Sequence, residues 1–234
     1  MLAVLKRELS AYFKAPVGYV FVAASFLFSG FFFWSFSLSS GSTDVSGVFQ
    51  GMFYVYMIFV PILTMRLMAE DNRQKTDQLL LTAPVSLFGL VFGKFLSAYI
   101  IFLLGDIIML IYGVVMSFFG AANWAMIFGN FVALALVGAI FVSSGLFIST
   151  LTESQMIAAI GSFALNLTLM LITTLTSVIP WKVVNDIIVS LSIFDRYYEF
   201  TEGIFSLSNT FFFLSVTVIF MFLTVRVLEK RRWA

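Results

Sequence analysis

The sequence AEDNRQKTDQLLLTAPVS, residues 69–86, is a polar segment between two long apolar runs. Acidic Glu70 stands near its start and basic Lys75 follows, which is the charge order that a helix dipole favours. Pro84 restricts the residue before it, so a helix here ends at or before that point. Ser86 is suited to cap the helix that follows. The segment therefore predicts a short amphipathic helix between two apolar ones.

The composition places these apolar runs in a membrane. Hydrophobic residues make up 61% of the chain and charged residues 11%, with a mean hydropathy of +1.06, far from the values of soluble domains. A helix needs about 20 apolar residues to cross about 30 Å of hydrocarbon. We therefore expect an all-α polytopic membrane protein with a single transmembrane domain over residues 1–234. Six spans are predicted, at 17–38, 52–68, 95–117, 125–149, 156–179 and 210–228.

The chain contains neither Cys nor His. This excludes disulfides, thiolate and imidazole chemistry and the commonest metal ligands, so no metal site is predicted. Residues 1–16, MLAVLKRELSAYFKAP, carry basic side chains, but no small-residue cleavage site closes the apolar run after them. We interpret them as mature sequence that forms an amphipathic helix on the membrane surface, and not as a signal peptide.

The basic residues predict the orientation, since Lys and Arg near span ends are retained on the cytoplasmic side. Of the 13 basic residues, all but Lys182 and Arg196 precede span one, lie between spans two and three, or follow span six. We expect both termini and residues 69–86 on the cytoplasmic side of the cytoplasmic (inner) membrane, and residues 180–209 outside. Taken alone, the polar segment is better explained as a plain cytoplasmic loop, since such loops are usually polar and basic.

A longer stretch around this segment bears on whether it is a plain loop or a functional helix. PILTMRLMAEDNRQKTDQLLLTAPVSLFGLVFGK, residues 61–94, resembles the coupling region of type 2 ABC transporter permeases. SIFDRYYEFTEGIFSLSNTFFFLS, residues 192–215, looks like the outer re-entrant region before their last span, and LTVRVLEKRRW, residues 223–233, is similar to their C-terminal ending. The likeness is strongest to the six-span permeases found beside gliding-motility and nitrous-oxide-reductase maturation ATPases.

The resemblance implies that residues 69–86 form a coupling helix, predicted over 69–83, that docks on a separate ABC ATPase subunit. Family members often have Gly where Lys75 stands here. ATP would act through that partner, and no cofactor would bind this chain directly. A second permease subunit, as homo- or heterodimer, and membrane lipid are further expected partners, whereas nucleic acid is not. The predicted docking side chains lie at three- and four-residue spacings on neighbouring turns: Glu70, Arg73, Thr76, Asp77 and Leu80.

No catalytic motif is complete. The nearest approach to a phosphate-binding loop is GLVFGKF, residues 89–95. The motif needs four residues between its glycines and a Ser or Thr after the lysine, but Gly89 and Gly93 are separated by three residues and Phe95 follows Lys94. We interpret the stretch as a small-residue packing face whose lysine extends to the membrane interface. The chain is therefore predicted not to be an enzyme.

Polar residues within the spans are candidates for a pathway or a dimer interface. Asp106 lies in span three, where an ionised carboxylate costs about 2.5–3.5 kcal/mol, so we expect it to face protein or water or to be protonated. A hydrogen bond to a neighbouring hydroxyl is the structural alternative. In span five, Ser162, Asn166, Thr173 and Ser177 share one helix face. Close helix packing explains such a stripe as readily as a channel does, and the resemblance places this span near the seam between two permease subunits.

The outer segment, residues 180–209, combines an apolar helical face with acidic residues. We predict one or two short re-entrant helices that cap the dimer, with docking of an extracytoplasmic partner as the alternative. The predicted function is that of an exporter permease subunit; a self-sufficient secondary transporter or channel is the alternative, which residues 61–94 and the shortage of intramembrane charged pairs disfavour. The substrate does not follow from the sequence. The apolar face consists of Ile187, Ile188, Leu191 and Phe194, and the acidic residues are Asp186, Asp195, Glu199 and Glu202.

Overall fold

The computed structural model describes residues 1–75, 86–120, 122–172, 192–203 and 206–233, and all regular structure within them is helical. The expected all-α fold is therefore confirmed. The helices are α1 Leu2–Lys14, α2 Pro16–Phe32, the π-helix η1 Phe33–Leu38, α3 Ser46–Thr64, α4 Arg66–Gln74, α6 Leu87–Asp106, α7 Ile108–Phe119, α8 Trp124–Leu151, α9 Gln155–Leu171, α11 Ile193–Thr201 and α12 Leu207–Trp233.

Five helical segments of the described chain are long and apolar enough to cross a membrane. They agree with the predicted first, second, third, fourth and sixth spans. The fifth prediction, residues 156–179, falls on α9, whose described part has 17 residues; residues 173–191 lie outside the described chain. The number of six spans stays a prediction. The five segments are Pro16–Leu38, Ser46–Gln74, Leu87–Phe119, Trp124–Leu151 and Leu207–Arg232.

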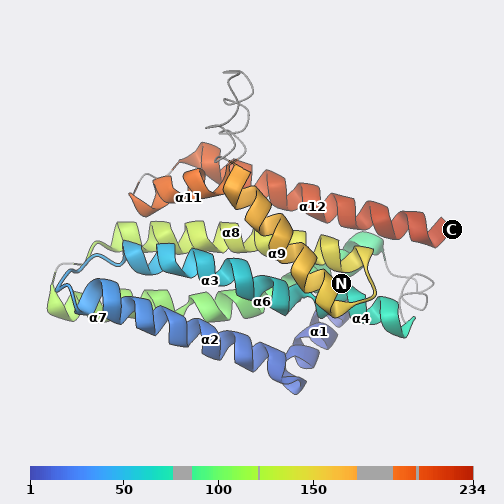
Figure 1. Cartoon of the computed structure of the whole chain (residues 1–234), viewed down its shortest axis with the longest axis horizontal. Helices are drawn as coiled ribbons and strands as arrows, with labels where there is room; N and C mark the ends of the chain where they lie inside the picture. Colours follow the sequence, from blue (N-terminus) through green and yellow to red (C-terminus); the bar gives the residue numbers. More distant parts are fainter. Residues whose placement is uncertain (76–85, 121, 173–191, 204–205, 234) are drawn as a thin grey trace.

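Helix α8 is the centre of the bundle. It packs against α3, α6, α9 and α12, with α12 on one side and α3 and α6 on the other (Figure 1). Two glycines allow the closest approaches. A Cβ at Gly138 would overlap the ring of Phe102 on α6, and a Cβ at Gly145 would overlap the side chain of Thr64 on α3. Because glycine has no side chain, these two positions allow α3 and α6 to pack closely against α8.

Two long spans are interrupted within the bundle. Met65 separates α3 from α4, one turn after Pro61, and its N–H donates to the Pro61 carbonyl at 2.9 Å. Proline has no N–H and removes one bond from the helix ladder, which favours a bend in this span. Ile107 separates α6 from α7, directly after Asp106. A polar residue adjoins each break: Arg66 follows Met65, and Asp106 precedes Ile107.

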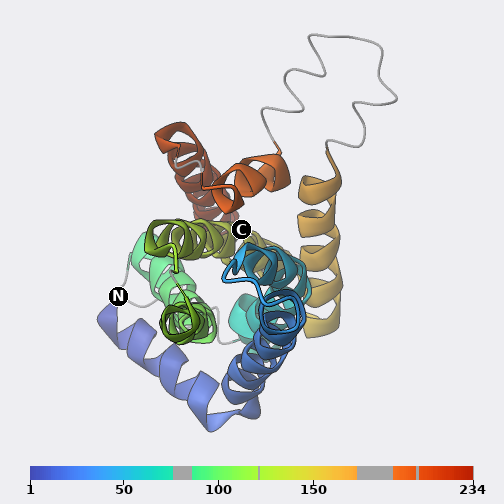
Figure 2. The same cartoon turned by 90° about the vertical axis from the view of Figure 1, so that its left-hand side faces the viewer.

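Helix α1 spans Leu2–Lys14 of the predicted residues 1–16 and lies along the outside of the bundle, where it packs against α2 and α6 (Figure 2). It is amphipathic: Tyr12 is buried, whereas Lys6 and Lys14 are exposed. Extended Ala15 (φ −89°, ψ 151°) forms the corner between α1 and α2. Proline is well suited to the first position of α2, since its missing N–H would have no intrahelical partner there. The predicted amphipathic helix is present, and its place at a membrane surface stays a prediction.

Helix α11 lies at the other end of the bundle from α4 (Figure 1). Ser192 caps it by accepting the Asp195 N–H at 3.1 Å. Buried Tyr197 donates to the Phe49 carbonyl at 2.8 Å, and the ring of Phe194 lies 5.4 Å from that of Phe53. These contacts fix α11 to the first half of α3. Of the predicted apolar face, Ile187, Ile188 and Leu191 lie outside the described residues, as does Asp186.

Candidate functional site

The candidate site is α4, which leaves the bundle where the predicted coupling region begins. One face of α4, including Leu67 and Asn72, is buried, while Arg73 and Gln74 are exposed at its end. Lys75 adopts a left-handed conformation (φ 56°) that ends the helix. The predicted continuous helix over residues 69–83 is therefore wrong at Lys75. Thr76, Asp77 and Leu80 lie outside the described residues.

The start of α4 is capped by a side chain from another helix. Ser149 Oγ on α8 accepts the N–H groups of Met68 at 3.1 Å and Ala69 at 3.0 Å, and it donates to the Met65 carbonyl at 2.9 Å. The first four N–H groups of a helix have no intrahelical acceptor. They are usually satisfied by a residue just before the helix, but here α8 supplies the acceptor. Ser149 therefore joins the start of α4 to the end of α8.

A second link between the same helices lies one turn further along α4. The side-chain amide of Asn72 donates to the carbonyls of Thr150, at 3.2 Å, and Thr152, at 3.1 Å. These carbonyls belong to the end of α8, where they have no intrahelical donor. Asn72 is buried, so its two bonds are shielded from water. The amide thus holds the middle of α4 against the last residues of α8.

Lys94 of α6 holds the opposite side of α4. Its ammonium lies 2.6 Å from Asp71 Oδ2 and 3.1 Å from Glu8 Oε1, and it also donates to the Leu67 carbonyl. The Lys94 side chain is only 2% exposed. The predicted extension of this lysine to the interface is wrong. It turns inward because two carboxylates and a carbonyl satisfy a charge that could not be buried alone.

The predicted packing face beside Lys94 is supported. A Cβ at Gly93 would lie 3.2 Å from the side chain of Val4, so α1 approaches α6 at this glycine. The close approach brings Glu8, one turn after Val4, within reach of Lys94. The glycine and the lysine therefore act together to bring α1 beside α4.

Further contacts join α1 directly to α3 and α4. Tyr12 donates to the Leu63 carbonyl at 2.8 Å, and the guanidinium of Arg66 lies 5.5 Å from the centre of the Tyr12 ring. Burial raises the pKa of Tyr12 well above its usual range, so the phenol stays protonated and keeps donating. Arg66 also pairs with Glu70 at 3.5 Å. Among the predicted docking residues, Glu70 is therefore already engaged, whereas the exposed Arg73 extends from the end of α4.

Helix α4 is held against the bundle by polar contacts on several sides. It is bonded to α8, α6 and α1, and its exposed end lies beyond these contacts. A family model described as ABC-2 family transporter protein matches residues 32–233. The chain belongs to the ABC-2 transporter family. It is therefore a type 2 ABC transporter permease, a multi-pass membrane subunit, as the sequence resemblance predicted. A comparison with curated proteins found no match.

In this ABC-2 permease, Asp106 is completely buried at the end of α6. Neither of its carboxylate oxygens has a hydrogen-bond partner among the described residues, and the same holds for the hydroxyl of buried Tyr56. The predicted alternative, a hydrogen bond to a neighbouring hydroxyl, is not found in this part of the chain. The unsatisfied carboxylate keeps Asp106 among the candidates for a functional role.

The two described residues of the predicted polar stripe on α9 face into the bundle. Ser162 and Asn166 are buried, and the side-chain oxygen Oδ1 of Asn166 accepts a hydrogen bond from the Ser144 hydroxyl of α8 at 2.8 Å. These contacts are those expected from close helix packing. Thr173 and Ser177 lie outside the described residues. The exposed apolar side chains of α9 include Met156, Ile157 and Ile160.

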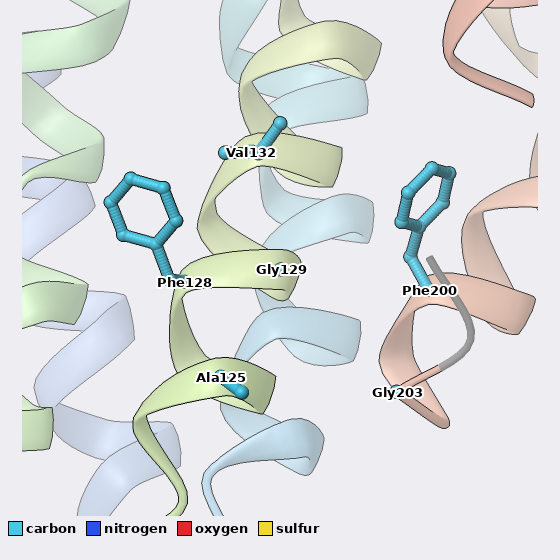
Figure 3. Close-up of a pocket in the computed structure, with 6 residues that line it drawn as sticks. All are labelled: Ala125, Phe128, Gly129, Val132, Phe200 and Gly203. Atoms are coloured by element: carbon cyan, nitrogen blue, oxygen red, sulfur yellow. The ribbon is translucent and has the colours of Figure 1, made fainter. Parts of the chain in front are cut away.

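A pocket that sequence reasoning missed lies near the start of α8. Residues of α8 at about one-turn spacing line one side, and residues at the end of α11 line the other (Figure 3). Its volume is about 260 Å³. Gly129 lies about 30 Å along α8 from Ser149, given a rise of about 1.5 Å per residue, so the pocket is remote from α4. The lining residues carry no charged group and are Ala125, Phe128, Gly129, Val132, Phe200 and Gly203.

Proposed function

We propose that the protein is the permease subunit of an ABC exporter in which residues 69–86 dock on a separate ATPase. The observation that carries the proposal is that α4 is bonded to the membrane helices while its C-terminal end is exposed. Ser149 and Asp71 bond it to α8 and α6, while Arg73 and Gln74 are exposed at its end. A docking element needs both an accessible tip and firm attachment to the helices that it must move.

The bonds of α4 define two routes for a displacement of its end. Ser149 and Asn72 lead to α8, which contacts most of the other membrane helices. The Asp71–Lys94–Glu8 cluster leads to α6 and α1. Because packed helices shift as rigid elements, a movement of α4 by the ATPase would reach the bundle through both routes. ATP would be bound and hydrolysed by the partner alone.

The orientation and assembly follow from the same proposal. The α4 end and both termini would lie in the cytoplasm, with the chain in the inner membrane as the positive-inside rule favours. A second permease subunit, identical or related, completes the transporter. Since Ser162 and Asn166 are buried and Asn166 contacts α8, the exposed apolar face of α9 is the side open to that subunit. Asp106 is proposed as a pathway residue and α11 as part of an outer cap.

The test is binding and stimulation of the cognate ATPase by the purified permease. Arg73→Glu reverses an exposed charge at the α4 end and should weaken binding by about tenfold, most strongly at low salt. Lys14→Glu is the matched control, because Lys14 is an exposed basic residue at the end of α1. Correct insertion of both variants is checked by thiol labelling at an introduced cysteine.

An inserted Arg73→Glu variant that binds and stimulates the ATPase like the parent would overturn docking at this end of α4. A permease that neither co-purifies with nor stimulates the ATPase would refute the partnership altogether. In that case, transport by the chain alone in proteoliposomes would support the secondary transporter as the alternative function.

A further inference from the structure

An apolar groove lies between α6 and α12, with α8 as its floor. Its volume is about 410 Å³, within the usual range of about 300–1,000 Å³ for ligand pockets. On α6 the wall is a ladder of aromatic rings: Phe88 and Phe92 stack at 10° and Phe95 and Tyr99 at 13°. On α12 the wall is formed mainly by aliphatic side chains, including Val218, which is 64% exposed. The groove is therefore open on the side between α6 and α12.

The chemistry of the lining restricts the occupant to hydrocarbon. Tyr99 and Thr217 supply the polar side-chain groups of the lining. The Tyr99 hydroxyl donates to the Ala135 carbonyl at 3.1 Å, and the Thr217 hydroxyl donates to the Phe213 carbonyl at 2.9 Å. Both hydroxyl protons are thus used within the protein. A polar ligand would lose its bonds to water without replacement, whereas an alkyl chain would not.

The length of the groove matches one leaflet of a bilayer. From Phe88 to Tyr99, α6 rises about 16 Å at about 1.5 Å per residue, close to half of the roughly 30 Å hydrocarbon thickness. Antiparallel α12 covers the same length between Leu214 and Val225. Since Phe88 lies at the start of α6, the groove belongs to the leaflet on the α4 side.

Basic side chains mark the end of the groove that faces the headgroups. Arg226 follows Val225, and its guanidinium lies 4.8 Å from the centre of the Phe222 ring, which also lines the groove. It pairs with Glu229 at 2.8 Å and remains 61% exposed. The last turns of α12 add Lys230, Arg231 and Arg232. Four basic residues against one acidic residue at the end of a membrane helix attract anionic lipids.

We propose that this groove binds one acyl chain of an anionic phospholipid in the leaflet on the α4 side, with the phosphate held by Arg226 and the basic residues after it. The lipid would fill the space between α6 and α12 and fix their separation. It would touch Phe95, the neighbour of Lys94. Anionic lipid would therefore stabilise the helix that carries the lysine of the α4 cluster.

The test uses the purified full-length chain in detergent, titrated with phosphatidylglycerol or phosphatidylcholine of identical acyl chains. Bound lipid is counted by native mass spectrometry. Phosphatidylglycerol should be retained about fivefold better, the preference that roughly one additional cation contact gives. Val218→Trp should abolish the difference by filling the groove, and Arg226→Gln should remove the preference while leaving chain binding. Ile219→Trp is the matched control, because Ile219 is a neighbouring, 54% exposed residue outside the lining.

Equal retention of both lipids by the parent, or equal behaviour of Val218→Trp and Ile219→Trp, would overturn the proposal. If Val218→Trp does not yield folded protein, Leu214→Trp fills the same groove from a 45% exposed position. Cysteine at Val218 provides a separate check. Efficient disulfide linkage of two copies in membranes would show that a second subunit covers the groove, and this would also refute the lipid site.

Discussion

The ammonium of Lys94 lies 2.6 Å from the carboxylate of Asp71, and this pair joins α6 to α4 across the polar segment that separates them in sequence. Glu8 of α1, at 3.1 Å, completes the cluster. Three elements from different parts of the chain thus share one buried positive charge. The cluster connects the proposed docking helix to the membrane bundle without relying on the loop between them.

Lys94→Met should destabilise the folded permease by about 1–3 kcal/mol, because Glu8, Asp71 and the Leu67 carbonyl lose their buried donor. The measurement is the thermal unfolding midpoint in detergent, together with stimulation of the ATPase. Lys6→Met is the control, since Lys6 is exposed on α1. An unchanged midpoint and normal stimulation in Lys94→Met would contradict a structural role for the cluster.

Ser149→Ala should cost about 1–3 kcal/mol, the penalty for buried groups that lose their hydrogen-bond partner. Two N–H groups of α4 and the Met65 carbonyl would be left unsatisfied. Hydrogen exchange in α4 should rise more than in α12. Ser215→Ala serves as control because the exposed Ser215 hydroxyl bonds only within its own helix, to Phe211. Equal exchange rates in parent and Ser149→Ala would refute the cap.

Alanine at Gly138 or Gly145 should destabilise the bundle by about 1–3 kcal/mol through overpacking. The added methyl groups would overlap Phe102 and Thr64, respectively. Gly129→Ala is the control on the same helix, where a Cβ meets nothing within 4 Å. The thermal unfolding midpoints of the three variants are compared, and Gly129→Ala should have the highest. The packing described for α8 would be wrong if Gly129→Ala were the most damaging.

Cysteine introduced at Ser42 and at Gln74 should be labelled by an impermeant thiol reagent from opposite faces of the membrane. Both positions are exposed, and the natural chain has no Cys to interfere. Gln74 is expected to react from the cytoplasmic face, and Ser42, in the loop after the first predicted span, from the outer face. Labelling of both residues from the same face would show that the proposed topology is wrong.

Much of the fold was predictable because the membrane imposes simple rules. Long apolar runs must form helices to satisfy their backbone groups, so the positions of five described spans follow directly from the sequence. The end of α4 was less predictable. Lys75 in a left-handed conformation stops the helix, and nothing in the charge pattern of residues 69–83 indicates this. A residue other than Gly or Asn at such a position carries no strong local signal.

The sequence by itself determined the membrane class, the helical fold, the family resemblance and the location of the polar segment, since these depend on composition and on neighbouring residues. Only the tertiary structure decided how α4 is held. Glu8 and Lys94 are 86 residues apart, and Ser149 caps a helix that begins more than 80 residues earlier. Such contacts depend on which helix faces meet in three dimensions. Burial of Lys94 among carboxylates is stable only after those faces have packed, whereas local preference alone would extend the lysine toward water.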